Sequence, residues 1–205
     1  MFIVLEGIDG AGKSTQAARL VSWLKWTGEG RPVLWTREPG DWAGGKDLRH
    51  ILLEGDLQHP HSELLLFLAD RCEHVAYRIT PALQRREWVV CERYCDSTLA
   101  YQCWGRGISR RVVEELFSWC HFPRPDLSLW IDIPLDRAME RIRARGGLDR
   151  IEGEAEDFLE RVRQGFADLY REGPQWRRRI DGNREASAVE IAVRNEVQRT
   201  FGALS

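Results

Sequence analysis

The chain has 205 residues, of which 43% are hydrophobic and 30% are charged, and its formal net charge at pH 7 is −2. This composition suits one α/β domain with a sizeable core, so we expect a single domain over residues 1–205. A net charge so close to zero argues against a broad basic surface for nucleic acid. No apolar run approaches the ~20 residues that cross a bilayer, and the chain opens on a strand-like run rather than a signal peptide. We therefore expect a cytoplasmic protein without a membrane partner.

Cysteine spacing argues against a metal site and against a disulfide framework. The count is odd and the sequence contains no Cys-x-x-Cys pair, which predicts reduced thiols and disfavours zinc. The five cysteines are Cys72, Cys91, Cys95, Cys103 and Cys120.

A strand-like run at 2–6 leads directly into a glycine-rich loop, and helix-forming residues follow at 16–26. Gly7, Gly12, Lys13 and Ser14 have the spacing of a P-loop, which binds nucleotide phosphates. Glycines let consecutive backbone N–H groups converge on phosphate oxygens, and the following helix directs its positive end at the same anion. Lys13 would reach the outer phosphates and the Ser14 hydroxyl would ligate Mg²⁺. The predicted phosphate-binding residues are Gly7, Ile8, Asp9, Gly10, Ala11, Gly12, Lys13, Ser14 and Thr15.

Further along the chain, strand-like runs alternate with longer amphipathic stretches, a pattern typical of a parallel sheet covered on both faces. The predicted strands lie at 2–6, 32–36, 88–92, 127–133 and 178–181. Helices are predicted at 16–26, late in 41–55, at 62–85, 97–102, 109–121, 135–145 and 158–171, and up to about 201.

Charged side chains follow the second and third predicted strands, at the sheet edge where α/β proteins bind ligands. Arg37 and Arg93 are placed to hold phosphate with their forked donors, and Glu92 is placed to bind Mg²⁺. Phe67 and Arg71 are four residues apart on one helix face and suit a planar base, although spacing alone favours a core phenylalanine and an ion-paired arginine.

Six short motifs occur in a fixed order along the first three quarters of the chain. They are LEGIDGAGKST at 5–15, TREPG at 36–40, FLADR at 67–71, ERY at 92–94 with 97–102, GRG at 105–107, and RARGGLDRIE at 143–152. In this combination the chain resembles the thymidylate kinases, a group of P-loop nucleoside-monophosphate kinases. It departs from their pattern in two places: Asp41-Trp42 stand where the family has Gly-Thr, and Glu92 stands where it has Asp.

The resemblance implies a three-layer P-loop fold with a five-stranded parallel sheet of order 2-3-1-4-5. It implies transfer of the ATP γ-phosphate to dTMP, giving dTDP and ADP for dTTP synthesis, with Mg²⁺ as cofactor. It also implies a homodimer, whose interface we could not locate from periodicity.

The same resemblance implies a role for each candidate site residue. Lys13 and Arg145 would stabilise the transferring group, with Mg²⁺ held by Ser14 and Glu92. The predicted acceptor-binding residues are Arg37 and Arg93 for the phosphate, Asp9 for the sugar and phosphate region, Phe67 for stacking on thymine, Arg71 and Gln102 for its edge, Tyr101 beside the sugar 2′ position, and Ser97 on the same face.

A glycine-rich, charged segment at 141–153 is expected to act as a lid over ATP. Arg141, Arg143, Arg145 and Arg150 flank or occupy it, and a solvated helix face is the alternative interpretation. The loop between Gly7 and Lys13 contains no arginine, so the lid would supply that charge. By the resemblance this is the role of Arg145, and Arg141 would also contact ATP.

Three other functions stay open from the residues alone. The first is another monophosphate kinase or a deoxynucleoside kinase, of which the two acceptor-side arginines disfavour only the deoxynucleoside kinase. The second is a P-loop switch or ATPase, and the sequence has no Asn-Lys-x-Asp stretch to read guanine. The third is a non-catalytic nucleotide-binding relative.

Overall fold

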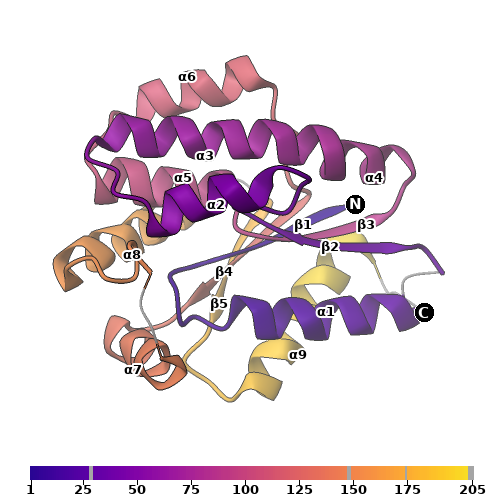
Figure 1. Ribbon diagram of the computed structural model, residues 1–205. Coiled ribbons are helices and arrows are strands. Elements are labelled where there is room, and N and C mark those ends of the chain that lie inside the picture. The colour runs from indigo at the N-terminus through magenta and orange to yellow at the C-terminus, as the bar shows by residue number, and fades with distance from the viewer. Residues whose placement is uncertain (28–29, 147–148, 174, 203–205) are drawn as a thin grey trace.

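The computed structural model describes residues 1–27, 30–146, 149–173 and 175–202. For Arg145 it describes the backbone alone. Five strands form one parallel sheet of order β2-β3-β1-β4-β5, which confirms the predicted order (Figure 1). The strands are β1 (Phe2–Glu6), β2 (Val33–Arg37), β3 (Trp88–Glu92), β4 (Leu127–Asp132) and β5 (Arg177–Asp181).

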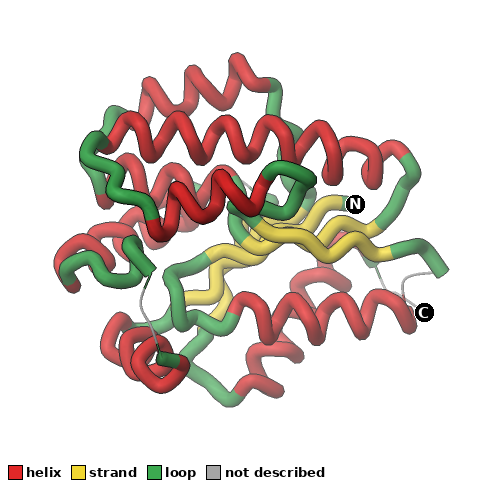
Figure 2. Tube along the Cα trace, in the orientation of Figure 1, coloured by secondary structure: helices red, strands yellow, loops and turns green. Residues whose placement is uncertain are grey.

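Helices cover both faces of the sheet, so the molecule has three layers (Figures 1 and 2). Helices α1 (Lys13–Thr27) and α9 (Ala186–Phe201) pack together on one face. The remaining helical segments are α2 (Gly45–Glu54), α3 (Pro60–His74), η1 (Val75–Ile79), α4 (Thr80–Gln84), α5 (Cys95–Thr98), η2 (Leu99–Gly105), α6 (Arg110–Cys120), α7 (Leu135–Arg145) and α8 (Glu156–Arg171).

The central strand β1 shows why the strands are apolar on both sides. Ile3 and Leu5 lie in the core cluster that includes α1 and α9, whereas Phe2 and Val4 pack with Ile79 and Ala82 in the opposite cluster. Successive side chains of a strand point to opposite faces, so a strand covered on both faces reads as an unbroken hydrophobic run.

The strand order brings the predicted site residues to one edge. Strand β3 lies between β1 and β2, where Glu92 is in register with both Leu5 and Arg37. The ends of these three strands therefore place the loop after Glu6 beside Arg37 and Glu92.

Two helical segments differ from their predictions. The predicted helix at 62–85 is continuous but has a wider π turn in η1, and the helix predicted at 97–102 is one α turn in α5 followed by the π segment η2. Strand β2 also ends one residue later than predicted, so Arg37 is its last residue.

Two expectations about composition can also be compared with the structure. Among the described residues, no helix combines the length and apolarity that a membrane crossing requires. All five cysteines are free thiols, as predicted.

Candidate active site

The loop between β1 and α1 adopts a backbone that requires glycine. Gly7, Gly10 and Gly12 have φ angles of 137°, 76° and 91°. A Cβ at Gly10 would lie 2.4 Å from the Ala138 carbonyl oxygen, so a side chain has no room there. Because glycine alone adopts such angles without strain, these three positions shape the predicted phosphate cradle.

Lys13 is the first residue of α1, and its side chain folds back over the loop. Its Nζ donates to the Gly7 and Ile8 carbonyl oxygens at 3.0 and 2.8 Å and lies 3.6 Å from Asp9 Oδ1. Burial, together with the nearby Arg93 charge, lowers the pKa of Lys13 to about 8. The loop itself therefore holds the ammonium group where the outer phosphates of a nucleotide would lie.

Ser14 and Glu92 form a pair of oxygen donors beside the loop. The Ser14 hydroxyl donates to Glu92 Oε2 at 2.5 Å, and the Trp35 indole N–H donates to Glu92 Oε1 at 3.0 Å. Mg²⁺ prefers oxygen ligands and commonly takes one or two from the protein, with the rest from water and substrate phosphate. The described residues contain no cluster of three or more metal-binding side chains. The Ser14–Glu92 pair fits this sparse mode of binding.

Arg93 joins the loop to a neighbouring pocket. It follows β3 with a φ of 66°, a strained value for a residue with a side chain. Its Nη2 donates to Asp9 Oδ1 at 2.6 Å, and its Nη1 donates to the Gly7 carbonyl at 3.2 Å and to Ser97 Oγ at 3.3 Å. The guanidinium carbon lies 5.2 Å from the centre of the Tyr101 ring. These contacts fix the guanidinium group, which lines both an adjacent pocket and an open cleft.

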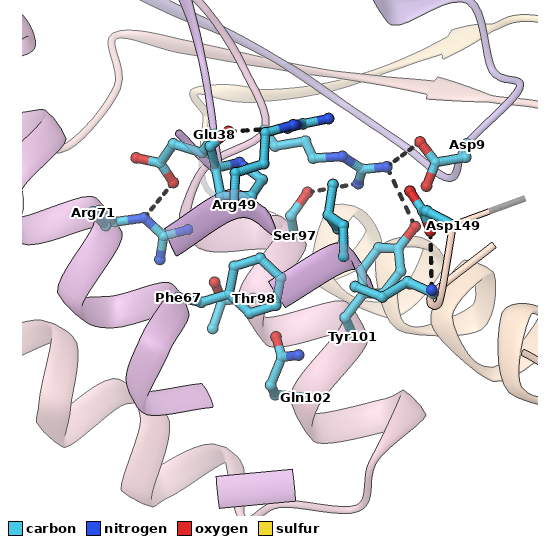
Figure 3. A pocket seen from close by; sticks show the side chains of 14 residues that line it. Asp9, Glu38, Arg49, Phe67, Arg71, Ser97, Thr98, Tyr101, Gln102 and Asp149 are labelled. Atoms are coloured by element: carbon cyan, nitrogen blue, oxygen red, sulfur yellow. Dashed lines mark hydrogen bonds and ion pairs between the residues drawn. The ribbon is translucent and has the colours of Figure 1, made fainter. Parts of the chain in front are cut away.

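A pocket that is lined in part by Arg93 lies next to the loop; Figure 3 shows it from close by. Seven of the predicted acceptor-binding residues line it, namely Asp9, Phe67, Arg71, Arg93, Ser97, Tyr101 and Gln102. A more open cleft adjoins it and shares Asp9 and Arg93 with it. The cleft is lined by the other predicted residues that the structure groups together, namely Gly10, Gly12, Lys13, Ser14, Thr15, Arg37, Glu92 and Arg141. Ile8 and Ala11 belong to the same loop, but their side chains are buried in the core.

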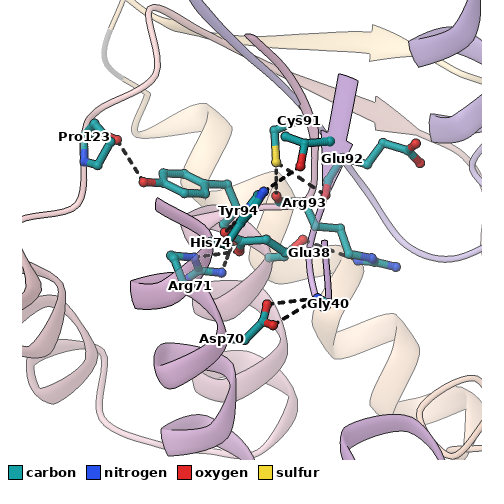
Figure 4. A network of polar contacts seen from close by, with 12 residues as sticks. Glu38, Gly40, Asp70, Arg71, His74, Cys91, Glu92, Arg93, Tyr94 and Pro123 are labelled. Carbon is teal, nitrogen blue, oxygen red and sulfur yellow. Dashed lines mark hydrogen bonds and ion pairs between the residues drawn. The ribbon is translucent and has the colours of Figure 1, made fainter. Parts of the chain in front are cut away.

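Arg71 forms the ion pair that its spacing favoured, and it also lines the pocket. Its Nε donates to Glu38 Oε2 at 2.7 Å and its Nη2 donates to the Tyr94 carbonyl at 3.0 Å (Figure 4). Its Nη1 is buried without a hydrogen-bond partner among the described residues. His74 supports Glu38 from behind, with its Nδ1 3.0 Å from Glu38 Oε1. The ion pair therefore holds the guanidinium group in place while its Nη1 remains an unused donor.

Three other pocket residues are held by neighbouring side chains. The Ser97 hydroxyl donates to Glu6, which also accepts the Ser97 backbone N–H, so Ser97 supports Arg93 as well as lining the pocket. Tyr101 is 6% exposed and forms a wall of the pocket. Gln102 donates its Nε2 to Glu63 Oε1 at 2.9 Å.

The predicted lid segment divides into two parts. Arg141 lies in α7, lines the open cleft and donates to the Gly10 carbonyl at 3.2 Å. The Arg145 side chain and residues 147–148 lie outside the described residues. Arg150 differs from the expectation that lid arginines face ATP, because it donates to the Leu52 carbonyl and pairs with Glu63 at 2.6 Å.

The loop that carries the departure from the family pattern is anchored to α3. The Trp42 indole N–H donates to Asp70 Oδ1 at 2.7 Å, the Gly40 backbone N–H donates to the same oxygen at 3.0 Å, and the Trp42 ring stacks on Tyr77. The Thr36 hydroxyl donates to Asp41 Oδ2 at 2.5 Å. Asp41 and Trp42, the two residues that depart from the family pattern, are therefore both hydrogen-bonded to other side chains.

Sequence analysis missed several residues of the site. Glu38, Arg49 and Asp149 line both cavities, and Glu63 lies behind Gln102. Glu63 had a usable signal, because it precedes Phe67 and Arg71 by one and two helical turns. Glu38 lay inside a quoted motif, but nothing in its spacing indicated a contact with Arg71.

Comparisons with known proteins agree with this geometry. A family model described as thymidylate kinase matches residues 5–193. The thymidylate kinase of Methylococcus capsulatus is 43% identical over 197 residues, covering 96% of this chain and 94% of the relative. The thymidylate kinase of Synechococcus sp. (strain JA-2-3B'a(2-13)) is 46% identical over 195 residues, covering 95% of this chain and 91% of the relative. The crystal structure of thymidylate kinase from Ehrlichia chaffeensis has a TM-score of 0.81 at 32% identity and covers 97% of this chain and 98% of that one. On these matches, the chain belongs to the thymidylate kinase family of nucleoside-monophosphate kinases.

Proposed function

We propose that the protein transfers the γ-phosphate of ATP to the 5′-phosphate of dTMP, giving dTDP and ADP in the route to dTTP. The observation that carries the proposal is the pair of adjoining cavities, one with Lys13 and the other with Arg71 and Gln102, joined at Arg93. A donor polyphosphate and an acceptor monophosphate can therefore meet end to end.

Phosphoryl transfer in this site rests on positioning and charge. The acceptor oxygens are largely ionised at pH 7, because a phosphate monoester loses its second proton near pH 6, so the step needs no strong general base. Arg93 and Arg37 hold the acceptor phosphate, and Asp9 fixes Arg93 through the 2.6 Å ion pair. Lys13 and Arg145 neutralise charge on the transferring group.

The metal site in this proposal consists of Ser14 and Glu92. Mg²⁺ bound there supplies positive charge to the donor phosphates. Trp35 keeps the Glu92 carboxylate in place through its indole N–H.

Base recognition in this proposal uses the buried end of the pocket. Phe67 stacks on thymine, the unpartnered Nη1 of Arg71 donates to a ring carbonyl, and Gln102 meets the base edge. Tyr101 lies beside the sugar 2′ position in this arrangement and would exclude a 2′-hydroxyl, so a deoxyribose is favoured. The thymine methyl group adds only about 1 kcal/mol of apolar burial.

A panel of acceptors tests the proposal. We expect kcat/KM with saturating ATP and Mg²⁺ to be highest for dTMP, measurable for dUMP, and far lower for UMP, dCMP and AMP. Cytosine and adenine would leave buried polar groups unpaired, and the 2′-hydroxyl of UMP would meet Tyr101. Equal turnover of AMP or dCMP would refute the assignment. ADP release that does not depend on any acceptor would favour an ATPase instead.

We further infer that the protein is a homodimer in the cytoplasm. Large apolar side chains are exposed on the adjoining helices α3 and α6, including Leu65 at 57% and Trp119 at 78%. Exposed apolar surface of this kind favours association with a second copy. Five free thiols suit a reducing compartment.

A further inference from the structure

Glu63 lies behind the base pocket, on the first turn of α3, and is 3% exposed. Its Oε1 accepts from Gln102 Nε2 at 2.9 Å and from Arg106 Nε at 3.1 Å. Its Oε2 accepts from Arg106 Nη2 at 3.0 Å and from Arg150 Nη2 at 2.6 Å. All the lone pairs of the carboxylate are therefore in use, although Glu63 does not itself line the pocket.

The ionised state of Glu63 is favoured by these partners. Burial alone would raise the pKa of Glu63, but the hydrogen bonds and charges of Arg106 and Arg150 outweigh it and hold the pKa below its usual value. An ionised carboxylate can only accept hydrogen bonds.

This restriction fixes the amide of Gln102. Because Glu63 only accepts, Gln102 must direct its nitrogen toward Glu63 and its oxygen the other way, and the side chain lines the pocket beside Phe67 (Figure 3). Thymine and uracil present an N3–H donor at the edge where cytosine presents a bare nitrogen and an amino group. An amide oxygen opposite N3 would accept from the N3–H of thymine and uracil, whereas with cytosine it would face the bare N3, another acceptor.

The other oxygen of Glu63 holds the segment that follows α7. Arg150 also donates to the Leu52 carbonyl at 2.9 Å, and its backbone N–H donates to the Leu53 carbonyl at 2.9 Å. The next residue, Ile151, is buried and lines the base pocket. One carboxylate thus contacts the base-reading amide on η2 and the chain that closes the opposite wall.

We propose that Glu63 is a positioning residue for acceptor selection, because it orients the Gln102 amide for thymine. Through Arg150, Glu63 also couples that orientation to the docking of residues 149–153. The inference rests on the proposed function, because it assigns a base to the pocket. The alternative is that Glu63 only neutralises two partly buried arginines and holds the fold together.

The first experiment compares Glu63→Gln with the parent and with a control, Glu115→Gln, which removes an exposed carboxylate paired to Arg111 on α6. A glutamine at 63 can also donate, so the Gln102 amide is free to turn. We expect the ratio of kcat/KM for dTMP over dCMP to fall at least tenfold in Glu63→Gln and to stay at the parent value in Glu115→Gln. An unchanged ratio in a folded Glu63→Gln protein would mean a structural role alone and overturn the proposal.

A second variant, Arg150→Gln, leaves the Glu63–Gln102 and Glu63–Arg106 contacts intact and lines neither cavity. It keeps the test valid if Glu63→Gln does not fold. We expect it to lower the same ratio at least threefold, although Arg150 does not reach the base. If Arg150→Gln lowered kcat/KM equally for dTMP and dCMP, the proposed coupling between Arg150 and the Gln102 orientation would be refuted.

The parent enzyme separates this inference from the proposed function. If the parent does not prefer dTMP over AMP and dCMP, the assigned base is wrong and the Glu63 inference falls with it. If the parent prefers dTMP but both variants keep its ratio, only the Glu63 inference fails.

Discussion

Lys13 is the residue whose surroundings bear most directly on catalysis. Its ammonium group is buried and held by two carbonyl oxygens of the loop, so its charge is already in place before a nucleotide binds. A preorganised charge stabilises a transition state without the cost of reorganisation during the reaction. The two adjoining cavities meet close to this group.

Replacing Lys13 by alanine should therefore abolish most of the activity and leave the protein folded. We expect kcat to fall by about 10²–10³, the usual loss when one preorganised donor is removed. Steady-state kinetics with dTMP, together with circular dichroism to check folding, measures this. A kcat within about threefold of the parent would contradict the role of Lys13.

The lowered pKa of Lys13 predicts a pH dependence of nucleotide binding. A pKa of about 8 means that the free protein loses this positive charge as pH rises through 8, while phosphates are fully ionised below that pH. ATP affinity should therefore be nearly constant from pH 7 to 7.5 and then fall by about tenfold for each pH unit well above 8. Calorimetric titration across this range measures it, and binding to Lys13→Met should be weaker but flat. A fall of similar slope in Lys13→Met would assign the titration to another group.

Site residues could be predicted from the sequence where they belong to a local motif. Gly7, Lys13 and Ser14 were found because strand, loop and helix follow one another in the chain. The partners of Arg71 and Gln102 were not, since Glu38 and Glu63 lie 33 and 39 residues away from them. Such pairs arise from the packing of separate elements, and no periodicity reveals them.

At the scale of elements, the loop after β2 joins two walls of the base pocket. Glu38 and Pro39 line the pocket from this loop, and Phe67 and Arg71 line it from α3. Asp70 connects the two by accepting from the Gly40 N–H and the Trp42 indole. Burial raises the pKa of Asp70 to about 6, and the Trp42 hydrogen bond opposes that rise.

A Trp42→Phe substitution isolates this connection, because phenylalanine can still stack on Tyr77 but has no N–H donor. We expect the free energy of unfolding to fall by about 1–3 kcal/mol, as for the loss of a hydrogen bond to a charged group. We also expect the KM for dTMP to rise by about threefold to tenfold with a smaller change in kcat, since the pocket walls lose their alignment. Urea denaturation and kinetics measure both effects.

Trp26→Phe provides the matched control, because Trp26 is 91% exposed. If Trp42→Phe behaves like Trp26→Phe in stability and in KM, the loop does not depend on its bond to Asp70.

The elements themselves were predicted well because hydrophobic runs and helical periodicity decide them. All five strands were found within about a residue at each end, and the strand order followed from the resemblance. The π turn in η1 had a local cause that was overlooked. Pro81 cannot donate to the Tyr77 carbonyl and its ring clashes there, so the preceding turn widens and the Thr80 N–H bonds to Val75. For η2 we see no such local cause.

At the scale of the whole molecule, the proposed dimer makes a measurable prediction. Light scattering should give about twice the chain mass of 23.8 kDa. Leu65→Glu on α3 should shift the protein toward the monomer, because a buried charge in the interface has no partner. Ile191→Glu on α9 is the control, since Ile191 is also exposed, at 60%, but lies on the opposite layer. A monomeric parent, or dissociation by both variants alike, would exclude an interface that includes Leu65.

Trp35 gives the molecule an optical property that follows from its hydrogen bond to Glu92. An excited indole has a large dipole, so its emission responds to charge placed near its N–H group. A divalent cation arriving at Glu92 would change that environment, and the ring is 44% exposed, so a quencher dissolved in the solvent can reach it. The chain has nine tryptophans, so the emission of a Trp35→Phe protein is subtracted from that of the parent to isolate the contribution of Trp35. If Mg²⁺ binds at Glu92 as proposed, Trp35 emission should therefore report its binding without a labelled nucleotide.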